Sequence, residues 1–187
     1  MWAVSNDTPY SADRAFVRDR DGAEIWIVAV RATYDILPDG RVALAKTQVP
    51  VALAPAWMGK PAESSLRWDM DMVRTKLGTD VVLHASAHAP QGKPTEEVEV
   101  GFAVGPIQKR LRVFGDRIYH RPMLVVKPDP PRPFETMPIT YERTYGGQSF
   151  DDETGALTAQ HDENPLGMGL VSHPGFPCHN TEYPGDA

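Results

Sequence analysis

The chain has a single cysteine, Cys178, among its 187 residues, so an internal disulfide framework is excluded. Such sparing use of cysteine is typical of proteins that work in a reducing cytoplasm. No apolar run reaches the length that spans a bilayer. The first residues have no basic stretch followed by an apolar one, so they predict no secretory signal. We therefore expect a cytoplasmic location.

Basic residues are missing from the end of the chain. After Arg143 there is no Lys or Arg, although seven of the 25 acidic residues lie there. The first 143 residues are nearly neutral, with 19 basic and 18 acidic groups. This balance argues against a nucleic-acid-binding surface. The acidic end is either a solvated loop or a docking segment for a basic partner.

No segment shows the apolar stripe of a helix, and 18 prolines and 15 glycines punctuate the chain. Period-two alternation dominates instead. The sequence therefore predicts a mainly β, antiparallel, two-sheet β-sandwich-like single domain. We expect strands over residues 14–20, 24–36, 41–45, 81–88, 97–104, 107–113 and 139–145.

The segment 24–36 is the strongest strand candidate. One face carries Trp26, Val28, Val30, Ala32 and Tyr34, and the other begins with Ile25, Ile27 and Ala29. A strand that is apolar on both faces is expected in the centre of a sheet. Turn signals at Asp21-Gly22 and Asp39-Gly40 bracket it, which predicts a three-stranded meander. Gly146-Gly147 predicts a positive φ or a close backbone approach after the strand 139–145.

Two segments have no clear period. Residues 127–133 are rich in proline and predict an extended polyproline II stretch, either a crossover or a ligand for a partner. Residues 150–187 form an acidic irregular C-terminal segment, which packs on the domain or orders on a partner. We therefore expect a mainly β domain over residues 1–149, followed by that segment.

Residue patterns with a catalytic or metal-binding mechanism are scarce. His84 and His88 lie about 13 Å apart on a strand, too far to share one zinc ion. The group His161, His173, Cys178 and His179 matches no spacing with a known mechanism. Asp69 and Asp71 form a D-x-D without a nearby glycine loop, and Glu142 has no evident carboxylate partner. We predict no catalytic residue, no metal ligand and no cofactor.

Candidate protein-interaction residues come from two places. Trp57, Met58, Trp68, Met70 and Met72 cluster in a Pro/Gly-flanked region, where they either anchor a partner or cap the core. The basic side chains of Lys109, Arg110, Arg112, Arg117 and Arg121 form either a solvated strand face or a patch for an acidic protein segment. The predicted interaction residues are Trp57, Met58, Trp68, Met70, Arg112, Arg117 and Tyr145.

Several motifs occur in a fixed order along the chain. They are Trp26-Ile-Val-Ala-Val-Arg-Ala-Thr-Tyr34, Ser64-Ser-Leu-Arg-Trp-Asp69, Lys76 with Thr79-Asp80, Ala85-Ser-Ala-His-Ala-Pro90 with Gly92, Leu111-Arg-Val-Phe-Gly-Asp-Arg117, Pro138-Ile-Thr-Tyr-Glu-Arg-Thr-Tyr-Gly-Gly147 and Asn164-Pro-Leu-Gly-Met-Gly169. This ordered set resembles a bacterial family first catalogued as a domain of unknown function and now described as an accessory, or effector-adaptor, component of the type VI secretion system.

The resemblance implies a non-catalytic adaptor that stabilises an effector protein or loads it onto the secretion spike of VgrG and PAAR proteins. Neither nucleic acid nor membrane is an expected partner. The alternative is a small β-sandwich hydrolase that acts on glycans or the cell wall. That enzyme would need two carboxylates about 5–9 Å apart in a cleft, or a bound metal.

Overall fold

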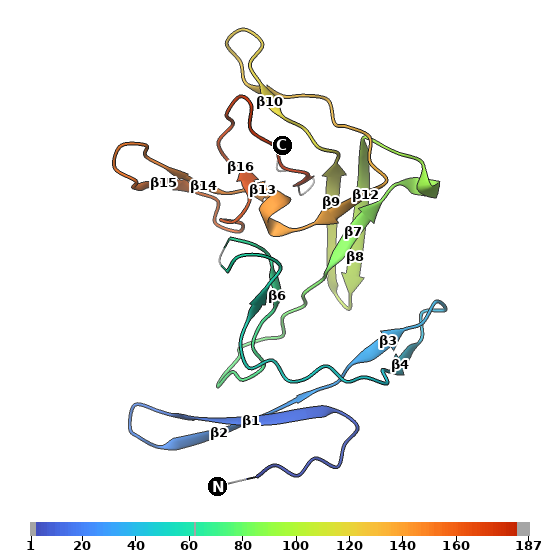
Figure 1. Ribbon diagram of the computed structural model, residues 1–187, viewed down its shortest axis with the longest axis vertical. Helices are drawn as coiled ribbons and strands as arrows, with labels where there is room; N and C mark the ends of the chain where they lie inside the picture. Colours follow the sequence, from blue (N-terminus) through green and yellow to red (C-terminus); the bar gives the residue numbers. More distant parts are fainter. Residues whose placement is uncertain (1–2, 62, 183–187) are drawn as a thin grey trace. The chain divides into compact units, whose positions relative to one another are not determined.

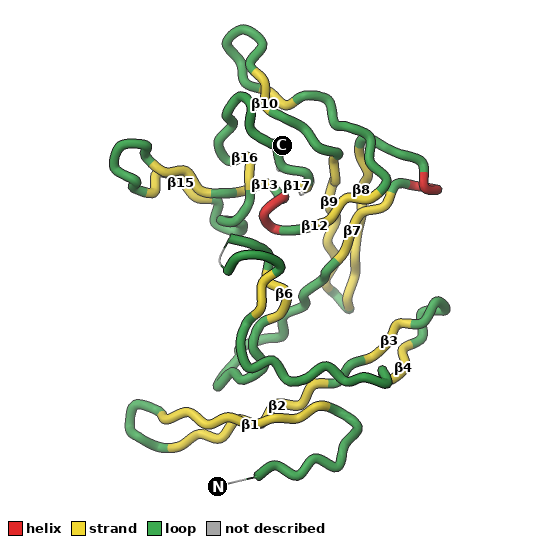
Figure 2. The backbone as a smooth tube through the Cα atoms, viewed as in Figure 1, coloured by secondary structure: helices red, strands yellow, loops and turns green. Residues whose placement is uncertain are grey.

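The structure is a computed structural model that describes residues 3–61 and 63–182. The prediction of a mainly β protein with antiparallel pairing is confirmed, because most pairings join antiparallel strands in several small sheets (Figure 1). The helical turns described are two short 3-10 turns, Pro90–Gly92 and Tyr141–Arg143 (Figure 2). None of the helices described is long and apolar enough to cross a membrane. The strands are β1 (Ser11–Arg18), β2 (Glu24–Arg31), β3 (Tyr34–Ile36), β4 (Val42–Leu44), β5 (Ala56–Trp57), β6 (Leu66–Trp68), β7 (Ala85–His88), β8 (Glu97–Val104), β9 (Ile107–Phe114), β10 (Tyr119–His120), β11 (Lys127–Pro128), β12 (Thr136–Ile139), β13 (Tyr145–Gly146), β14 (Gln148–Phe150), β15 (Leu157–Gln160), β16 (Met168–Gly169) and β17 (Thr181–Glu182).

The chain divides into two compact units. Unit 1 comprises Met1–Trp57 and Leu66–Val82, and unit 2 comprises Met58–Ser65 and Leu83–Ala187. The strands described in unit 1 form three antiparallel pairs, β1–β2, β3–β4 and β5–β6. The turns after Asp21 and Asp39 form as predicted, with Gly22 at φ 83° and Gly40 at φ 81°. Glycine is favoured at both positions because the left-handed conformation costs it nothing.

The prediction of one central strand over residues 24–36 is wrong. The strand β2 ends at Arg31, and β3 begins at Tyr34 and pairs with β4 in a separate hairpin. The side chain of Gln48 occupies the break, because it accepts from the Thr33 amide at 2.8 Å and donates to the Thr33 carbonyl at 3.0 Å. Among the strands that the structure describes, β1 alone pairs with β2, and the Val28 residue is 57% exposed. The alternation of side chains in residues 24–36 therefore reflects a two-stranded hairpin, and not a strand that is covered on both faces.

Unit 2 holds the apolar core. The sheet β17-β9-β8 lies next to the pair β7–β12, and the bridge between Thr95 and Phe134 joins their ends. Both predicted strands around Gly105-Pro106 are present as β8 and β9. Their inward side chains Val98, Val100 and Leu111 pack against a buried cluster of Ala87, Val113, Phe134 and Met137. The predicted strand 81–88 is present in part, as β7.

The predicted strand 139–145 is also wrong in its extent. β12 ends at Ile139, the 3-10 turn Tyr141–Arg143 follows, and the short strand β13 resumes the extended path. Gly146 and Gly147 have φ values of 146° and 116°, as expected. A Cβ atom on Gly146 would lie 2.3 Å from the Asn164 carbonyl oxygen, so the close approach that was predicted is present.

The acidic C-terminal segment contains several short strands. β14 and β15 form a hairpin, β16 pairs in parallel with β13, and β17 pairs with β9. Thr181 in β17 has 0% exposure and is bracketed by Val113 on β9 and by Thr144. The end of the described chain is therefore an inner strand of unit 2. Within the proline-rich stretch 127–133, Lys127–Pro128 forms β11 and pairs with β10.

Candidate functional site

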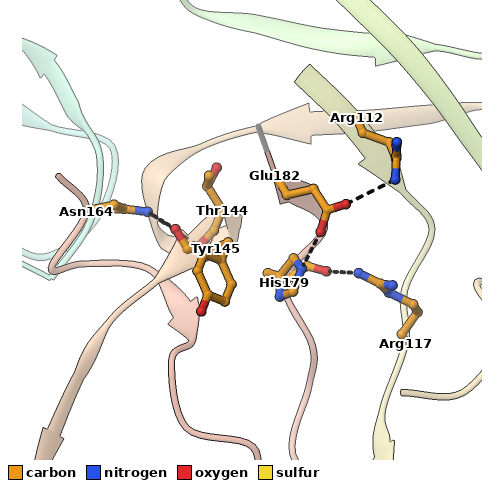
Figure 3. Close-up of polar contacts among 7 residues, drawn as sticks. All are labelled: Arg112, Arg117, Thr144, Tyr145, Asn164, His179 and Glu182. Atoms are coloured by element: carbon orange, nitrogen blue, oxygen red, sulfur yellow. Dashed lines mark hydrogen bonds and ion pairs between the residues drawn. The ribbon is translucent and has the colours of Figure 1, made fainter. Parts of the chain in front are cut away.

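A group of polar side chains lies in unit 2 where β9, β13, β16 and β17 meet (Figure 3). We call it the C-terminal clasp, because most of its bonds fasten the segment around β17 to the rest of the unit. Its members are Arg112, Arg117, Thr144, Tyr145, Asn164, His179 and Glu182.

The carboxylate of Glu182 is the centre of one half of the clasp. It lies 3.1 Å from Nε2 of His179 and 3.5 Å from Nη1 of Arg112 (Figure 3). Glu182 and Arg112 are also cross-strand partners on β17 and β9, which brings opposite charges face to face. Glu182 is buried, so its negative charge needs both partners.

Burial lowers the pKa of His179 below its ordinary value of 6.5. The Glu182 carboxylate acts in the opposite direction, and the positive charge of Arg117 adds to the lowering. His179 is therefore neutral at pH 7, as a hydrogen-bonded partner of Glu182.

The second ring nitrogen of His179, Nδ1, is sealed off. It has no hydrogen-bond partner among the described residues and no contact with solvent. The ring of Tyr145 meets the imidazole edge-on at 5.1 Å, and a Cβ atom on Gly169 would lie 2.6 Å from Nδ1. A general base must reach the proton that it abstracts. In this arrangement Nδ1 faces atoms of the described chain, while Nε2 links the ring to Glu182.

The side chain of Arg117 holds the segment around β17 by a bond to the backbone of that segment. Its Nη2 donates to the His179 carbonyl at 3.0 Å, and its guanidinium lies 4.0 Å from the ring centroid of Phe114. The neighbouring thiol of Cys178 is buried, and burial raises its pKa. A raised pKa keeps Cys178 protonated and unreactive.

Asn164 is the centre of the other half. Its Nδ2 donates to the backbone carbonyls of Tyr141, Tyr145 and Thr144 at 2.9, 3.1 and 3.4 Å. Figure 3 shows Asn164 pointing towards the backbone of Thr144 and Tyr145. The backbone carbonyl of Asn164 accepts from the amides of Gly147 and Gly167. The buried Asn164 thus fixes the backbone between the 3-10 turn Tyr141–Arg143 and β13. This explains why a continuous strand does not form there.

Two further polar links join segments that are distant in the sequence. The Ser65 amide and hydroxyl donate to Oε2 of Glu142 at 3.0 and 2.5 Å, and the Tyr141 amide donates to the Ser65 hydroxyl at 2.8 Å. Burial by itself would raise the pKa of Glu142, but these hydrogen bonds outweigh burial and lower it. Arg143 pairs with Asp116 at 2.6 Å and donates to Asn180 at 2.9 Å.

The predicted interaction residues fall into two groups. Trp57, Trp68 and Met70 belong to unit 1, and Met58, Arg112, Arg117 and Tyr145 belong to unit 2. Met72, also in unit 1, is buried. The structure brings Arg112, Arg117 and Tyr145 together, but against His179 and Glu182 of their own chain.

Sequence reasoning gave no structural role to Asn164, His179, Asn180 or Glu182, although Asn164 begins one of the ordered motifs. Asn164 could have been predicted from its position shortly before Gly167 and Gly169. Backbone carbonyls and amides in such a segment need hydrogen-bond partners.

The residues considered for metal binding have other contacts. Asp71 accepts from the Ala52 amide at 2.8 Å and pairs with Arg31 at 3.3 Å, and Asp69 accepts from the Met70 amide. Within residues 3–61 and 63–182, His, Cys, Asp and Glu side chains form no group of three or more that is placed to hold a metal ion.

Comparison with known protein families shows the family to which the chain belongs. Residues 21–184 match a bacterial family described as "Uncharacterized protein conserved in bacteria (DUF2169)". The match covers most of the chain, so the chain belongs to this family. No curated protein matches the chain. No solved structure matches it either.

The clasp predicts a pH dependence of stability. The folded pKa of His179 is below its value in the unfolded chain, so the unfolded state binds the proton more tightly. Stability from this group is fully present above pH 6.5 and declines as the pH falls through 6.5 towards the folded pKa. We expect His179→Gln to lose about 1–2 kcal/mol at pH 7.5, because a bond to Glu182 is weakened. Its unfolding free energy should also vary less than that of the wild type between pH 7.5 and 5.5.

Urea unfolding at several pH values measures this effect. His173→Gln is the matched control, since His173 is exposed. The depressed pKa of Glu142 acts in a separate window, where stability is lost as the pH falls below its ordinary value of 4.5. Equal pH slopes for His179→Gln and the wild type between pH 7.5 and 5.5 would contradict the assignment.

Proposed function

We propose that this protein is a non-catalytic adaptor of the type VI secretion system, which binds an effector protein in the bacterial cytoplasm and helps load it onto the VgrG and PAAR spike. On the side of sequence, the proposal is supported by the ordered motifs and the resemblance that they carry. The residues of four of these motifs meet in and around the C-terminal clasp, as Ser65, Asp116, Tyr145 and Asn164. Their contacts build a rigid scaffold, as a binding protein needs.

The observation that carries the proposal is the exposed apolar face of the β1–β2 ribbon. Phe16, Trp26, Val28 and Val30 lie on one face, next to Arg14, and all four apolar residues are exposed. On the other face of β2, Ile25, Ile27 and Ala29 are half-buried. The rings of Phe16 and Trp26 lie 5.6 Å apart, and a shallow groove runs beside Trp26 and Val28. An exposed apolar patch of this kind marks a protein-binding surface.

The ribbon also offers a way to bind. β1 and β2 pair with each other alone among the described strands, so each has an outer edge with unpaired backbone groups. An isolated two-stranded hairpin is marginally stable in water. A partner strand that added to either edge would satisfy these groups and cover the apolar face. Nothing in the described residues favours the hydrolase alternative over this adaptor.

The test begins with the effectors encoded in the type VI secretion loci of the native bacterium. Each is coexpressed and copurified with the full chain, and its affinity is measured by calorimetry. The proposal fails if none of them binds, or if deleting the gene changes neither the level nor the delivery of any effector.

We expect Val28→Asp to lower the affinity for the bound effector at least tenfold, because a charge would enter the apolar contact. Its unfolding free energy should stay within about 0.5 kcal/mol of the wild type, since the side chain is exposed. Val171→Asp, at an exposed valine in unit 2, is the control and should bind normally. Unchanged affinity for Val28→Asp would exclude the ribbon face as the contact.

A further inference from the structure

The hairpin formed by β10 and β11 ends in an exposed apolar tip, drawn as the loop beyond β10 in Figure 1. Met123 is 92% exposed, Leu124 is 89% exposed and Val125 is 65% exposed. Three large apolar residues in succession at such exposure are unusual, because each leaves its side chain in water. We call residues 123–125 the apolar tip.

The backbone holds this tip in a defined shape. Met123 has a φ of 62°, one of two non-glycine residues in the described chain with a positive φ. Pro122 precedes it and restricts its own φ. At the base of the hairpin, Tyr119 pairs with Pro128 and His120 with Lys127. A left-handed methionine is strained, and strained residues concentrate at sites that bind ligands.

Positive charge flanks the tip. Arg121 and Lys127 are exposed on either side of it, and neither forms an ion pair with any residue that the structure describes. Of the nearby carboxylates, Asp116 pairs with Arg143, and Asp129 lies 2.6 Å from Nδ1 of His120. The two cations are therefore available to an outside carboxylate.

We propose that the apolar tip is a plug that inserts into an apolar pocket of the partner protein, and that acidic side chains at the rim of that pocket pair with Arg121 and Lys127. This inference rests on the proposed function, because it takes the effector as the partner. Methionine suits the role, since its flexible side chain adapts to irregular pockets.

The charge of unit 2 favours a pocket over an anionic lipid surface. An apolar tip with basic flanks also fits such a surface. Yet unit 2 carries the acidic end of the chain, where Asp151, Asp152, Glu153, Asp162 and Glu163 lie without a single Lys or Arg. A broad anionic surface would repel these groups, whereas a pocket rim faces the tip alone.

The test uses the full chain, the effector that copurifies with it and three variants. Leu124→Asp should weaken effector binding at least tenfold. Met123→Gly should weaken it at least threefold while leaving the unfolding free energy equal or higher, because glycine relieves the positive φ. Arg121→Glu with Lys127→Glu should weaken binding and reduce its dependence on salt. Leu157→Asp is the control, since Leu157 is another exposed leucine of the same unit, at 52% exposure, and it should bind like the wild type.

The outcomes separate this inference from the proposed function. If Leu124→Asp and Met123→Gly bind the effector like the wild type while Val28→Asp does not, the plug is excluded and the adaptor stands. If no effector binds the wild type, both fail. Flotation with vesicles of phosphatidylcholine and phosphatidylserine tests the lipid surface. Binding of the wild type to these vesicles, lost in Leu124→Asp, would overturn the pocket in favour of a membrane.

Discussion

Replacement of Gly115 by alanine is expected to unfold unit 2 or to bring it close to unfolding. Gly115 follows the end of β9 and is buried. A Cβ atom there would lie 1.7 Å from the carbonyl oxygen of Arg132 and 2.8 Å from its carbonyl carbon. Both atoms belong to the backbone, so no side-chain rotation can relieve the overlap. We expect a loss of at least about 3 kcal/mol, at the upper end of what overpacking costs.

The cost is high because two chain segments are fixed at this point. The Gly115 amide donates to the Glu96 carbonyl at 2.9 Å, and the Arg132 amide donates to the Asp116 carbonyl at 3.1 Å. Moving either segment breaks one of these bonds and disturbs the neighbouring bridge between Thr95 and Phe134. Urea unfolding followed by circular dichroism measures the loss.

Gly78→Ala is the matched control for this prediction. No heavy atom lies within 4 Å of a Cβ placed on Gly78, and its φ is outside the left-handed region. Alanine should therefore leave stability unchanged or raise it by up to about 1 kcal/mol through the unfolded state. A Gly115→Ala protein as stable as the wild type would show that the two segments can separate without cost.

Hairpins were the part of the fold that the sequence predicted well. The turns at Asp21-Gly22, Asp39-Gly40 and Gly105-Pro106 depend on residues that are neighbours in the chain, and each joins two antiparallel strands in the structure. The number of strands that pair with a given strand could not be predicted in the same way. Alternation in residues 24–36 looks the same in a lone ribbon as in a covered sheet, so burial could not be predicted from it.

Long-range pairing was the part that the sequence could not predict. Thr181 pairs with Val113 across a separation of 68 residues, and the segment between them has no period that points to β9. Arg112, Arg117 and Tyr145 were predicted as residues that contact another protein, and in the structure they contact His179 and Glu182 of their own chain. Their partners His179 and Glu182 stayed hidden, since they lie in a segment whose acidity resembled a solvated loop.

The second large effect is expected from Asn164→Asp, an exchange of nearly identical shape. The Asn164 amide donates to three carbonyl oxygens in a buried position. A carboxylate in its place would turn a donor into a negative charge that faces those same oxygens. We expect a loss of about 3–5 kcal/mol at pH 7, comparable to leaving a buried charge without a partner. Typical domains have about 5–15 kcal/mol in all, so unit 2 would be marginal.

The pH dependence identifies the cause of that loss. Burial and the three carbonyls should raise the pKa of the new carboxyl in the folded state above its unfolded value of about 3.9. The variant should therefore lose stability relative to wild type as the pH rises through the folded pKa, and regain part of it near pH 4–5, where the neutral acid donates one hydrogen bond.

Asn164→Ala should cost about 1–3 kcal/mol with little change across this range, because it leaves carbonyls unpaired without adding a charge. Gln160→Glu makes the same chemical exchange at an exposed site of unit 2 and should cost less than about 0.5 kcal/mol. If Asn164→Asp matched Asn164→Ala at every pH, the loss would come from the missing donor and not from the charge against the three carbonyls.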